Sequence, residues 1–351
     1  MAVTIVEAAP GITGGVDTHL DKHVAAALDP LGRLVGTESF NADASGYKAL
    51  LAWLEEFGQV TKVGVEGTGS YGVGLARFLR RKGVEVVEVN RPNRQSRRSQ
   101  GKSDPLDAVE AARAAISGRA SGAGKTKDGP VEAIRVLVVA KRSARQARVK
   151  ALVQMRHLGI TAPDQLHSRL KGLSVTALVA EGAKLRSTRS SDPVTAATKA
   201  SLSSLAHRVQ SLDRELAELD EKIESLLLAT APDLLALFGV GPDTAASLLV
   251  AAGDNPGRLH SEAAWAHLCG VAPIPASSGK ITRHRLNPAG DRQANHVLWT
   301  IVLSRMTFEP RTRAYVQRRV LEGKSKMETI RCLKRYVARE VYPLLRVPVT
   351  D

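Results

Sequence analysis

The opening of the chain alternates short apolar runs with tight turns before any helical pattern begins. Three such runs lie in GITGGVDTH (11–19), HVAAALDPLG (23–32) and RLVGTESF (33–40), and the clearest turn is Asp29-Pro30-Leu31-Gly32. Connections this short favour antiparallel neighbours. We therefore expect the fold to start with a three-stranded antiparallel meander.

Helical and strand patterns then alternate. We expect a helix over 44–57, a strand over 63–67, a helix over about 70–82, a strand at VEVVEV (84–89) and a final helix from near Asp104. Three antiparallel strands followed by αβαβα is the element order of the ribonuclease-H-like fold. This predicts an α/β domain over 1–125 with the first strand central and the fourth beside it. The Gly- and Lys-rich stretch 118–130 is typical of a linker.

The next segment, 126–230, is predicted to be helical. A basic helix is expected from Val131 to about His157, and a loop around 186–193 leads into a long helix. Apolar residues along that long helix recur at alternating steps of three and four, as in a coiled-coil seam. They are Leu202, Leu205, Val209, Leu212, Leu216, Leu219, Ile223 and Leu226. The seam can pack against the 131–157 helix or join copies of the chain, and both interpretations stay open.

The last segment, 231–351, is predicted to be a mostly α C-terminal domain. Two short apolar helices flank Gly239-Val240-Gly241, and Pro242 stands at the favoured first helical position. A helix-hairpin-helix element has this pattern and presents backbone N–H groups to a phosphate. A plain helical hairpin has the same pattern.

The charge of the chain favours a polyanionic partner. Its net charge is +15 and its pI is about 10.1. The helical pattern at 327–345 has an apolar face and a cationic outer side. The apolar positions are Ile330, Leu333, Val337 and Val341, and the cationic ones are Arg331, Lys334, Arg335 and Arg339. A solvated face also carries charge, but so one-sided a distribution favours nucleic acid.

Composition also limits the location of the protein. The sequence has no apolar run of about 20 residues, the length needed to span a bilayer. Its N-terminus lacks the basic-then-apolar order of a secretion signal. Cys269 and Cys332 have no metal-ligand spacing and are interpreted as reduced thiols. We therefore expect a cytoplasmic protein without a membrane partner.

Four acidic residues stand at the ends of the expected elements. Asp17 ends the first strand and Glu66 the fourth, which brings them to one edge of the sheet. Asp104 and Asp107 share one helix face, with Asp104 expected as the N-cap and Asp107 pointing into the site. Hard oxygen ligands suit Mg²⁺ or Mn²⁺, and a pair of such ions can catalyse displacement at phosphorus. Each acid alone fits a cap, turn or surface role, but together they predict an enzyme acting on nucleic-acid phosphates.

With these acids placed, the chain resembles the DEDD transposases of the insertion-sequence-110 group, which are RNA-guided DNA recombinases. The matching motifs, in the family's order, are GVDTHLDKH, VGVEGTGSYG, KSDPLDA, LFGVGPDTA, LCGVAPIPASSGK, GDRQANHVLW and KRYVAREVY. The first three match the family's RuvC-like nuclease domain, which implies Asp17, Glu66, Asp104 and Asp107 as the metal-binding tetrad. The last four match its C-terminal transposase domain.

The resemblance further implies a serine nucleophile, donor and target DNA, a structured non-coding bridge RNA, a homo-oligomer (dimer or tetramer) and work at the bacterial nucleoid. The family's serine stands immediately before a glycine, which implies Ser278, with Ser277 in reserve; by residue type alone both are ordinary loop residues. Basic residues that could contact the nucleic acid follow at Lys280, Arg283, Arg285 and Arg292. Pro288-Ala289-Gly290 departs from the family, which has a Gly-Gly pair here.

Several residues near these sites have simpler interpretations. We interpret His19, His23 and His284 as polar support or phosphate contacts, because no metal-ligand spacing links them. Trp265 and Trp299 are interpreted as core residues, which leaves no stacking platform for single strands. Two other functions also fit the sequence: a RuvC-like nuclease or junction resolvase that uses the acids alone, and a nucleic-acid-binding copy that has lost catalysis.

Overall fold

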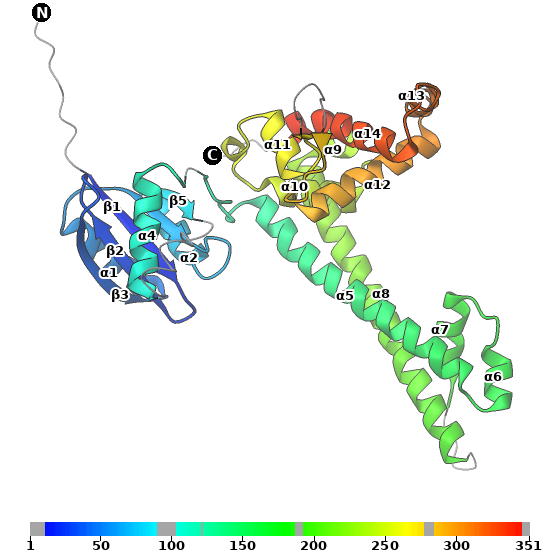
Figure 1. Cartoon of the computed structure of the whole chain (residues 1–351). Helices are drawn as coiled ribbons and strands as arrows, with labels where there is room; N and C mark the ends of the chain where they lie inside the picture. The colour runs from blue at the N-terminus through cyan, green and yellow to red at the C-terminus, as the bar shows by residue number, and fades with distance from the viewer. Residues whose placement is uncertain (1–10, 90–102, 121, 187–191, 277–283, 346–351) are drawn as a thin grey trace, which may run out of the picture. The chain divides into compact units, whose positions relative to one another are not determined.

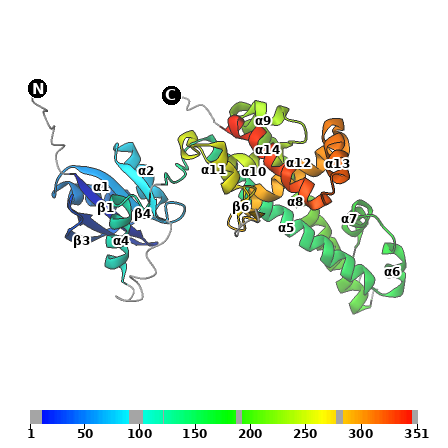
Figure 2. The ribbon, with the colours of Figure 1, turned by 45° about the horizontal axis from the view of Figure 1, so that its top comes forward.

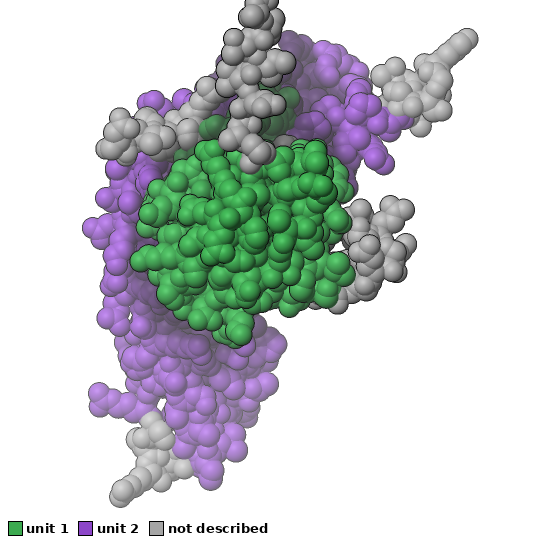
Figure 3. Space-filling view, turned by 90° about the vertical axis from the view of Figure 1, so that its left-hand side faces the viewer, with its two compact units in different colours: residues 1–129, 252–265, 346–351 green, residues 130–251, 266–345 purple. Residues whose placement is uncertain are grey.

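The computed structural model describes residues 11–89, 103–120, 122–186, 192–276 and 284–345. The chain divides into two compact units (Figure 3). The described residues of 1–129 and 252–265 form the first unit, and those of 130–251 and 266–345 form the second. No helix among the described residues is long and apolar enough to cross a membrane.

The first unit is built on a five-stranded mixed sheet (Figure 1). Its strands are β1 (Ile12–Thr18), β2 (Lys22–Leu28), β3 (Leu34–Asn41), β4 (Val60–Glu66) and β5 (Glu85–Val89). The strand order is β3-β2-β1-β4-β5, with β1–β2 and β2–β3 antiparallel and β1–β4 and β4–β5 parallel. The predicted meander, the central first strand and the neighbouring fourth strand are therefore confirmed.

Helices cover both faces of this sheet (Figures 1 and 2). They are α1 (Ala44–Glu55), α2 (Val73–Arg81) and α4 (Asp104–Ile116). Alternate residues of β2 belong to different cores, because Ala25 packs with residues of α1 and α2 whereas Val24 packs with residues of α4. This places α4 on the face opposite α1 and α2.

The second unit contains a long antiparallel helical pair (Figure 1). The pair consists of α5 (Pro130–Ile160) and α8 (Pro193–Thr230). The shorter helices α6 (Asp164–Leu170) and α7 (Val175–Lys184) lie between them in sequence. Lys141 of α5 pairs with Asp220 of α8, and Arg148 pairs with Asp213, so partner numbers fall along α8 as they rise along α5. Of the predicted seam positions, Leu202, Val209, Leu219 and Ile223 are buried within the chain, and Leu205, Leu212, Leu216 and Leu226 are half-buried. Packing of α8 against α5 within the chain is therefore observed, and a role of the seam in joining copies of the chain stays a prediction.

The remainder of the chain is largely helical. Its elements are α9 (Pro232–Ala236), α10 (Pro242–Ala252), η1 (Pro256–Arg258), α11 (Glu262–Leu268), β6 (Ile274–Pro275), β7 (His284–Arg285), α12 (Arg292–Phe308), α13 (Pro310–Leu321), α14 (Lys326–Val341) and η2 (Tyr342–Leu345). The predicted α/β start and mostly α remainder are confirmed. The apolar face of α14 is buried as predicted.

Two backbone N–H groups of the helical hairpin around Gly241 donate hydrogen bonds within the hairpin itself. The N–H of Gly241 donates a 2.8 Å hydrogen bond to Thr244 Oγ1, and the N–H of Val240 donates to Leu237 O at 3.0 Å. Asp243, in the first turn of α10, pairs with Lys141 and with Arg145. Although burial opposes it, these two cations lower the pKa of Asp243. The Asp243 carboxylate is therefore engaged by two cations of α5, and phosphate binding by this hairpin stays a prediction.

Candidate active site

The register of the sheet sets Asp17 beside Glu66. Val16 pairs with Val65 in the parallel β1–β4 ladder, so the next residue of each strand lies side by side at the carboxyl ends. The hydroxyl of Thr18 donates a 2.8 Å hydrogen bond to the backbone oxygen of Glu66, which ties the two strand ends together. Both acids thus come to one edge of the sheet, where the strand order predicts them.

Two glycines allow α4 to lie directly against these strands. A Cβ atom on Gly15 would come within 2.2 Å of the backbone oxygen of Ala108, and one on Gly64 within 2.4 Å of that of Ala111. Side chains alternate between the faces of a strand, so the residues two positions further along β1 and β4 face the helix as well.

Those residues are Asp17 and Glu66, and the first turn of α4 supplies Asp104 and Asp107. Asp104 lies four residues, about one turn, before Ala108, which contacts Gly15. Asp107 lies four residues before Ala111, which contacts Gly64. Acidic side chains also stabilise the positive end of a helix dipole. The first turn of α4 can therefore carry Asp104 and Asp107 on the side that faces the strand ends without a loss of helix stability.

The helix cap differs from the prediction. Ser103 is the N-cap and Asp104 is the first helical residue, so the expectation that Asp104 caps the helix is wrong. Its carboxylate instead lies 3.5 Å from His19 Nε2. Asp107 is buried, as its predicted inward direction requires.

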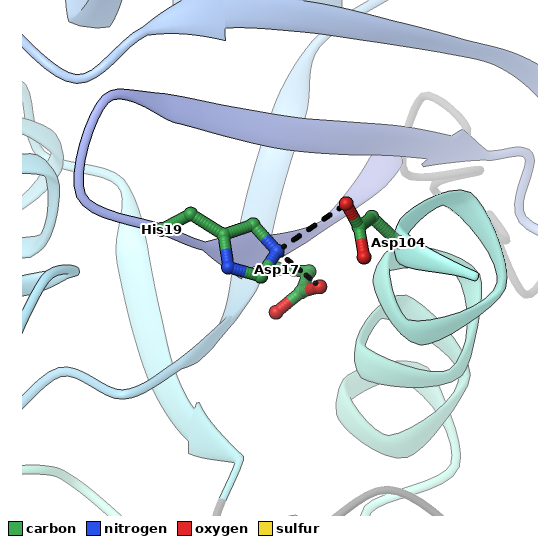
Figure 4. A group of neighbouring side chains, drawn as sticks. All are labelled: Asp17, His19 and Asp104. Carbon is green, nitrogen blue, oxygen red and sulfur yellow. Dashed lines mark hydrogen bonds and ion pairs between the residues drawn. The ribbon is translucent and has the colours of Figure 1, made fainter. Parts of the chain in front are cut away.

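His19 links two of the acids (Figure 4). Its Nε2 lies 3.1 Å from Asp17 Oδ2 and 3.5 Å from Asp104 Oδ2. One ligand atom of each of these three residues lies within 4.8 Å of the others, a spacing that could hold a metal ion. Glu66 and Asp107 stand outside this closest group, at the same sheet edge and helix start.

The electrostatics of Asp17 reflect this crowding. Burial raises the pKa of its carboxyl group; His19 opposes the rise, while Asp107 and Asp104 add to it. Burial is therefore the main cause of the raised pKa of Asp17, and repulsion from the two neighbouring carboxylates adds to it. A divalent cation would relieve that repulsion, and the donor set of hard oxygens with one imidazole is suitable for one.

The predicted nucleic-acid contacts gather in the second unit. A cavity of about 1050 Å³ is lined by α12, α14 and the loops next to β6 and β7. It takes in all the described members of the predicted set, namely Arg285, Arg292, Arg331, Lys334, Arg335 and Arg339. The other two members, Lys280 and Arg283, lie outside the described residues, as do the predicted nucleophile Ser278 and its reserve Ser277. Pro273 before that segment and His284 directly after it both line the cavity.

Two family models match the chain. A DEDD model of the IS110 group, described as a transposase, matches residues 14–158, and a model described as the transposase IS116/IS110/IS902 family matches residues 231–317. The chain belongs to the IS110 family of transposases. The first match covers the four acids of this IS110-family chain, and the second covers Arg285 and Arg292.

Proteins of two insertion elements align with part of the IS110-family chain. The insertion element IS900 uncharacterized 42 kDa protein of Mycobacterium paratuberculosis is 28% identical over 145 residues, which is 40% of this chain and 36% of that protein. The insertion element IS110 uncharacterized 43.6 kDa protein of Streptomyces coelicolor is 30% identical over 146 residues, or 41% and 36% of the two lengths. The aligned part thus spans about a third of each relative.

The structure narrows the interpretation of His23 and corrects that of Trp299 in the IS110-family chain. His23 is fully buried and its ring stacks on Tyr47 at 5.7 Å, which excludes a phosphate contact. Trp299 is 37% exposed and lines the cavity, so its assignment to the core is wrong, whereas Trp265 is fully buried as predicted.

His19 is a member of the acidic site that the sequence interpretation does not include. Its i,i+2 spacing from Asp17, which keeps both side chains on one face of an extended strand, is the signal that could have found it.

Proposed function

We propose that the protein is a DNA transposase of an insertion sequence, which cuts and rejoins DNA by phosphoryl transfer. The observation that carries this proposal is the approach of Asp17, Asp104 and Asp107 to one another at a sheet edge beside Glu66, in a chain of the IS110 family. The net charge of +15 and the cationic cavity support nucleic acid as the substrate.

Divalent metal is part of this proposal. Asp17, Glu66, Asp104 and Asp107 would hold Mg²⁺ or Mn²⁺. When bound, such an ion polarises the phosphate and favours deprotonation of an attacking hydroxyl. The chain's own contribution is to hold the acids in place, through the glycine contacts under α4 and through His19, which contacts Asp17 and Asp104.

We further propose Ser278 as the nucleophile, with Ser277 in reserve. The serine oxygen would bond to phosphorus and release the sugar oxygen of the cleaved strand, which leaves the protein esterified to DNA. The resemblance to the family supports this assignment, as do the cations on the described flank of the segment, Arg285 and Arg292. Lys280 and Arg283 would add to the charge that stabilises the transferring phosphoryl group.

The partners follow from the same proposal. They are donor and target DNA, a structured bridge RNA that pairs with both, and further copies of the chain in a homo-oligomer at the nucleoid. The element order and the strand order β3-β2-β1-β4-β5 support a RuvC-like, ribonuclease-H-like first unit. The α5–α8 pair would act as a spacer between the sequence segments that carry the acids and the serine.

A trapped protein–DNA adduct tests the function directly. The protein is co-expressed with its native flanking DNA, purified, and incubated with donor and target duplexes in Mg²⁺. We expect an adduct that resists denaturant for wild type and for the neighbouring control Ser277→Ala, and none for Ser278→Ala or Asp17→Asn.

Other outcomes would support the alternatives. Cleavage without an adduct, unchanged in Ser278→Ala, would contradict the serine mechanism and support a nuclease that uses the acids alone. Binding that survives Asp17→Asn, with no product from any variant, would show a copy that has lost catalysis.

A further inference from the structure

One face of α12 carries an exposed aromatic pair into the cavity. Arg292, Asn295, His296 and Trp299 follow at helical spacing and all line it. The rings of His296 and Trp299 lie 5.9 Å apart and 25° from parallel, and Trp299 is 37% exposed. The indole is therefore supported from one side and open to solvent.

The lining of the cavity as a whole adds charge and further apolar surface. Of the described residues that line the cavity, Glu328 is the acid, and it is engaged by Ser325 in the capping box of α14. The cations are Arg285, Arg292, Arg319, Lys324, Arg331, Lys334, Arg335 and Arg339. Exposed apolar side chains stand among them at Leu286, Met327 and Tyr336.

Hydrogen bonds join the α12 and α14 sides of the cavity lining. Lys334 Nζ donates to Asn295 Oδ1 at 2.7 Å, and Asn295 Nδ2 donates to the backbone oxygen of Cys269 at 2.8 Å. Burial and the neighbouring Arg331 lower the pKa of Lys334. The α12 and α14 walls are thus joined in a preformed arrangement that crowds positive charge, which an anion would relieve.

We infer that this cavity binds an unpaired stretch of DNA, with a base stacked on Trp299 and the flanking phosphates held by the cations. An intact duplex presents its phosphates outward and hides its base faces in the stack, so it could satisfy the cations but not the indole. A flipped or single-stranded nucleotide satisfies both. This inference rests on the proposed function, in which strands are opened and exchanged.

The test compares binding of single-stranded and duplex DNA by wild type and variants. Fluorescence anisotropy is measured with a short labelled strand, its duplex, the same strand with abasic sites, and the RNA of the same sequence. For Trp299→Ala we expect single-strand affinity to fall by about 5-fold to 150-fold, the change that corresponds to about 1–3 kcal/mol per stacked base. Affinity for the duplex and for the abasic strand is expected to stay unchanged.

Further variants separate stacking from packing and charge. Trp299→Phe keeps a flat ring and is expected to retain most of the single-strand affinity, whereas Trp299→Leu keeps apolar bulk and is expected to lose it. Phe308→Ala is the matched control, because Phe308 is a 68% exposed aromatic residue on the same helix outside the lining. Arg331→Ala should weaken single strand and duplex alike and reduce the salt dependence of both.

Several results would overturn the inference. They are wild-type affinity in Trp299→Leu, equal losses for strand, duplex and abasic strand in Trp299→Ala, or a Trp299 effect confined to RNA. Thermal unfolding of each variant verifies that the chain is folded. The adduct experiment with Ser278 is independent of this one. A missing adduct with intact Trp299-dependent binding would refute the proposed function, and an adduct without such binding would refute the inference.

Discussion

The close contact between Gly15 and α4 gives the sharpest prediction of how the acidic site is held. We expect Gly15→Ala to lower stability and to abolish metal binding together. The added Cβ atom would lie 2.2 Å from the backbone oxygen of Ala108 and from the backbone nitrogen of Ala112, and 2.6 Å from the Cβ atom of Ala112. Backbone atoms cannot rotate away as the end of a flexible side chain can, so the whole helix has to move.

The size of that movement sets the expected effect. Ordinary van der Waals contact begins at 3.4 Å, so the helix has to shift by roughly 1 Å. Overpacking of a tight core costs about 1–3 kcal/mol, and contact with two backbone atoms of α4 favours the upper end. Metal and catalytic sites tolerate about 0.5 Å of displacement. A shift of Asp104 and Asp107 relative to Asp17 by twice that amount should therefore remove the site even where the fold survives.

Urea denaturation and Mn²⁺ titration of the same samples measure both effects. We expect Gly15→Ala to lose about 3 kcal/mol of unfolding free energy and its metal-dependent rise in Tm. The matched control is Gly122→Ala in the same unit, where a Cβ atom meets nothing within 4 Å. If Gly15→Ala matched wild type in unfolding free energy and metal response, the packing of α4 on β1 could not be what places the acids.

Three further predictions concern charged and titratable groups. Lys141→Met should lower the unfolding free energy by about 2–3 kcal/mol in a denaturant titration, because one buried ammonium holds both Asp220 and Asp243. Asp17→Asn should raise the Tm in metal-free buffer, because the raised pKa of Asp17 means that its ionised form costs stability at neutral pH. The variant should also lose the rise in Tm that Mn²⁺ gives wild type. An unchanged or lower metal-free Tm would contradict this. Burial lowers the pKa of His23 below 6.5, so the unfolded chain binds more protons below that pH and stability falls as pH decreases. His23→Phe should remove this contribution, which is at most about 1.4 kcal/mol per pH unit; identical pH profiles for unfolding would refute it.

The position of the acidic site could be predicted because it depends on backbone topology. A meander followed by αβαβα leaves few ways to arrange five strands, and the central first strand then has the fourth as its parallel neighbour. Once Asp17 and Glu66 end those strands, the register brings them together without any knowledge of side-chain packing. The seam of α8 was recognised for a similar reason, but periodicity alone does not state whether the partner helix belongs to the same chain.

The detailed contacts of the site depend on tertiary geometry that no local pattern records. The N-cap of α4 is one example, because Ser103 and Asp104 are both good capping residues and their choice is set by where the helix meets the sheet. The role of His19 is another, because its contact with Asp104 joins residues from the β1–β2 turn and α4, which are far apart in sequence.

Trp299 is different, because its sequence surroundings already held the signal that it is not a core residue. The buried stripe of α12 follows steps of three and four through Ala294, Val297, Leu298, Ile301 and Val302. Trp299 falls directly after a member of that stripe, about 100° around the helix, and so faces the side that also carries Arg292 and His296. A large aromatic residue placed off the apolar stripe and among cations adds nothing to the core, and its face can stack on a flat group. The same periodicity that defines the core of α12 therefore also marks the position where a ligand with a flat apolar face and a negative backbone would be stabilised.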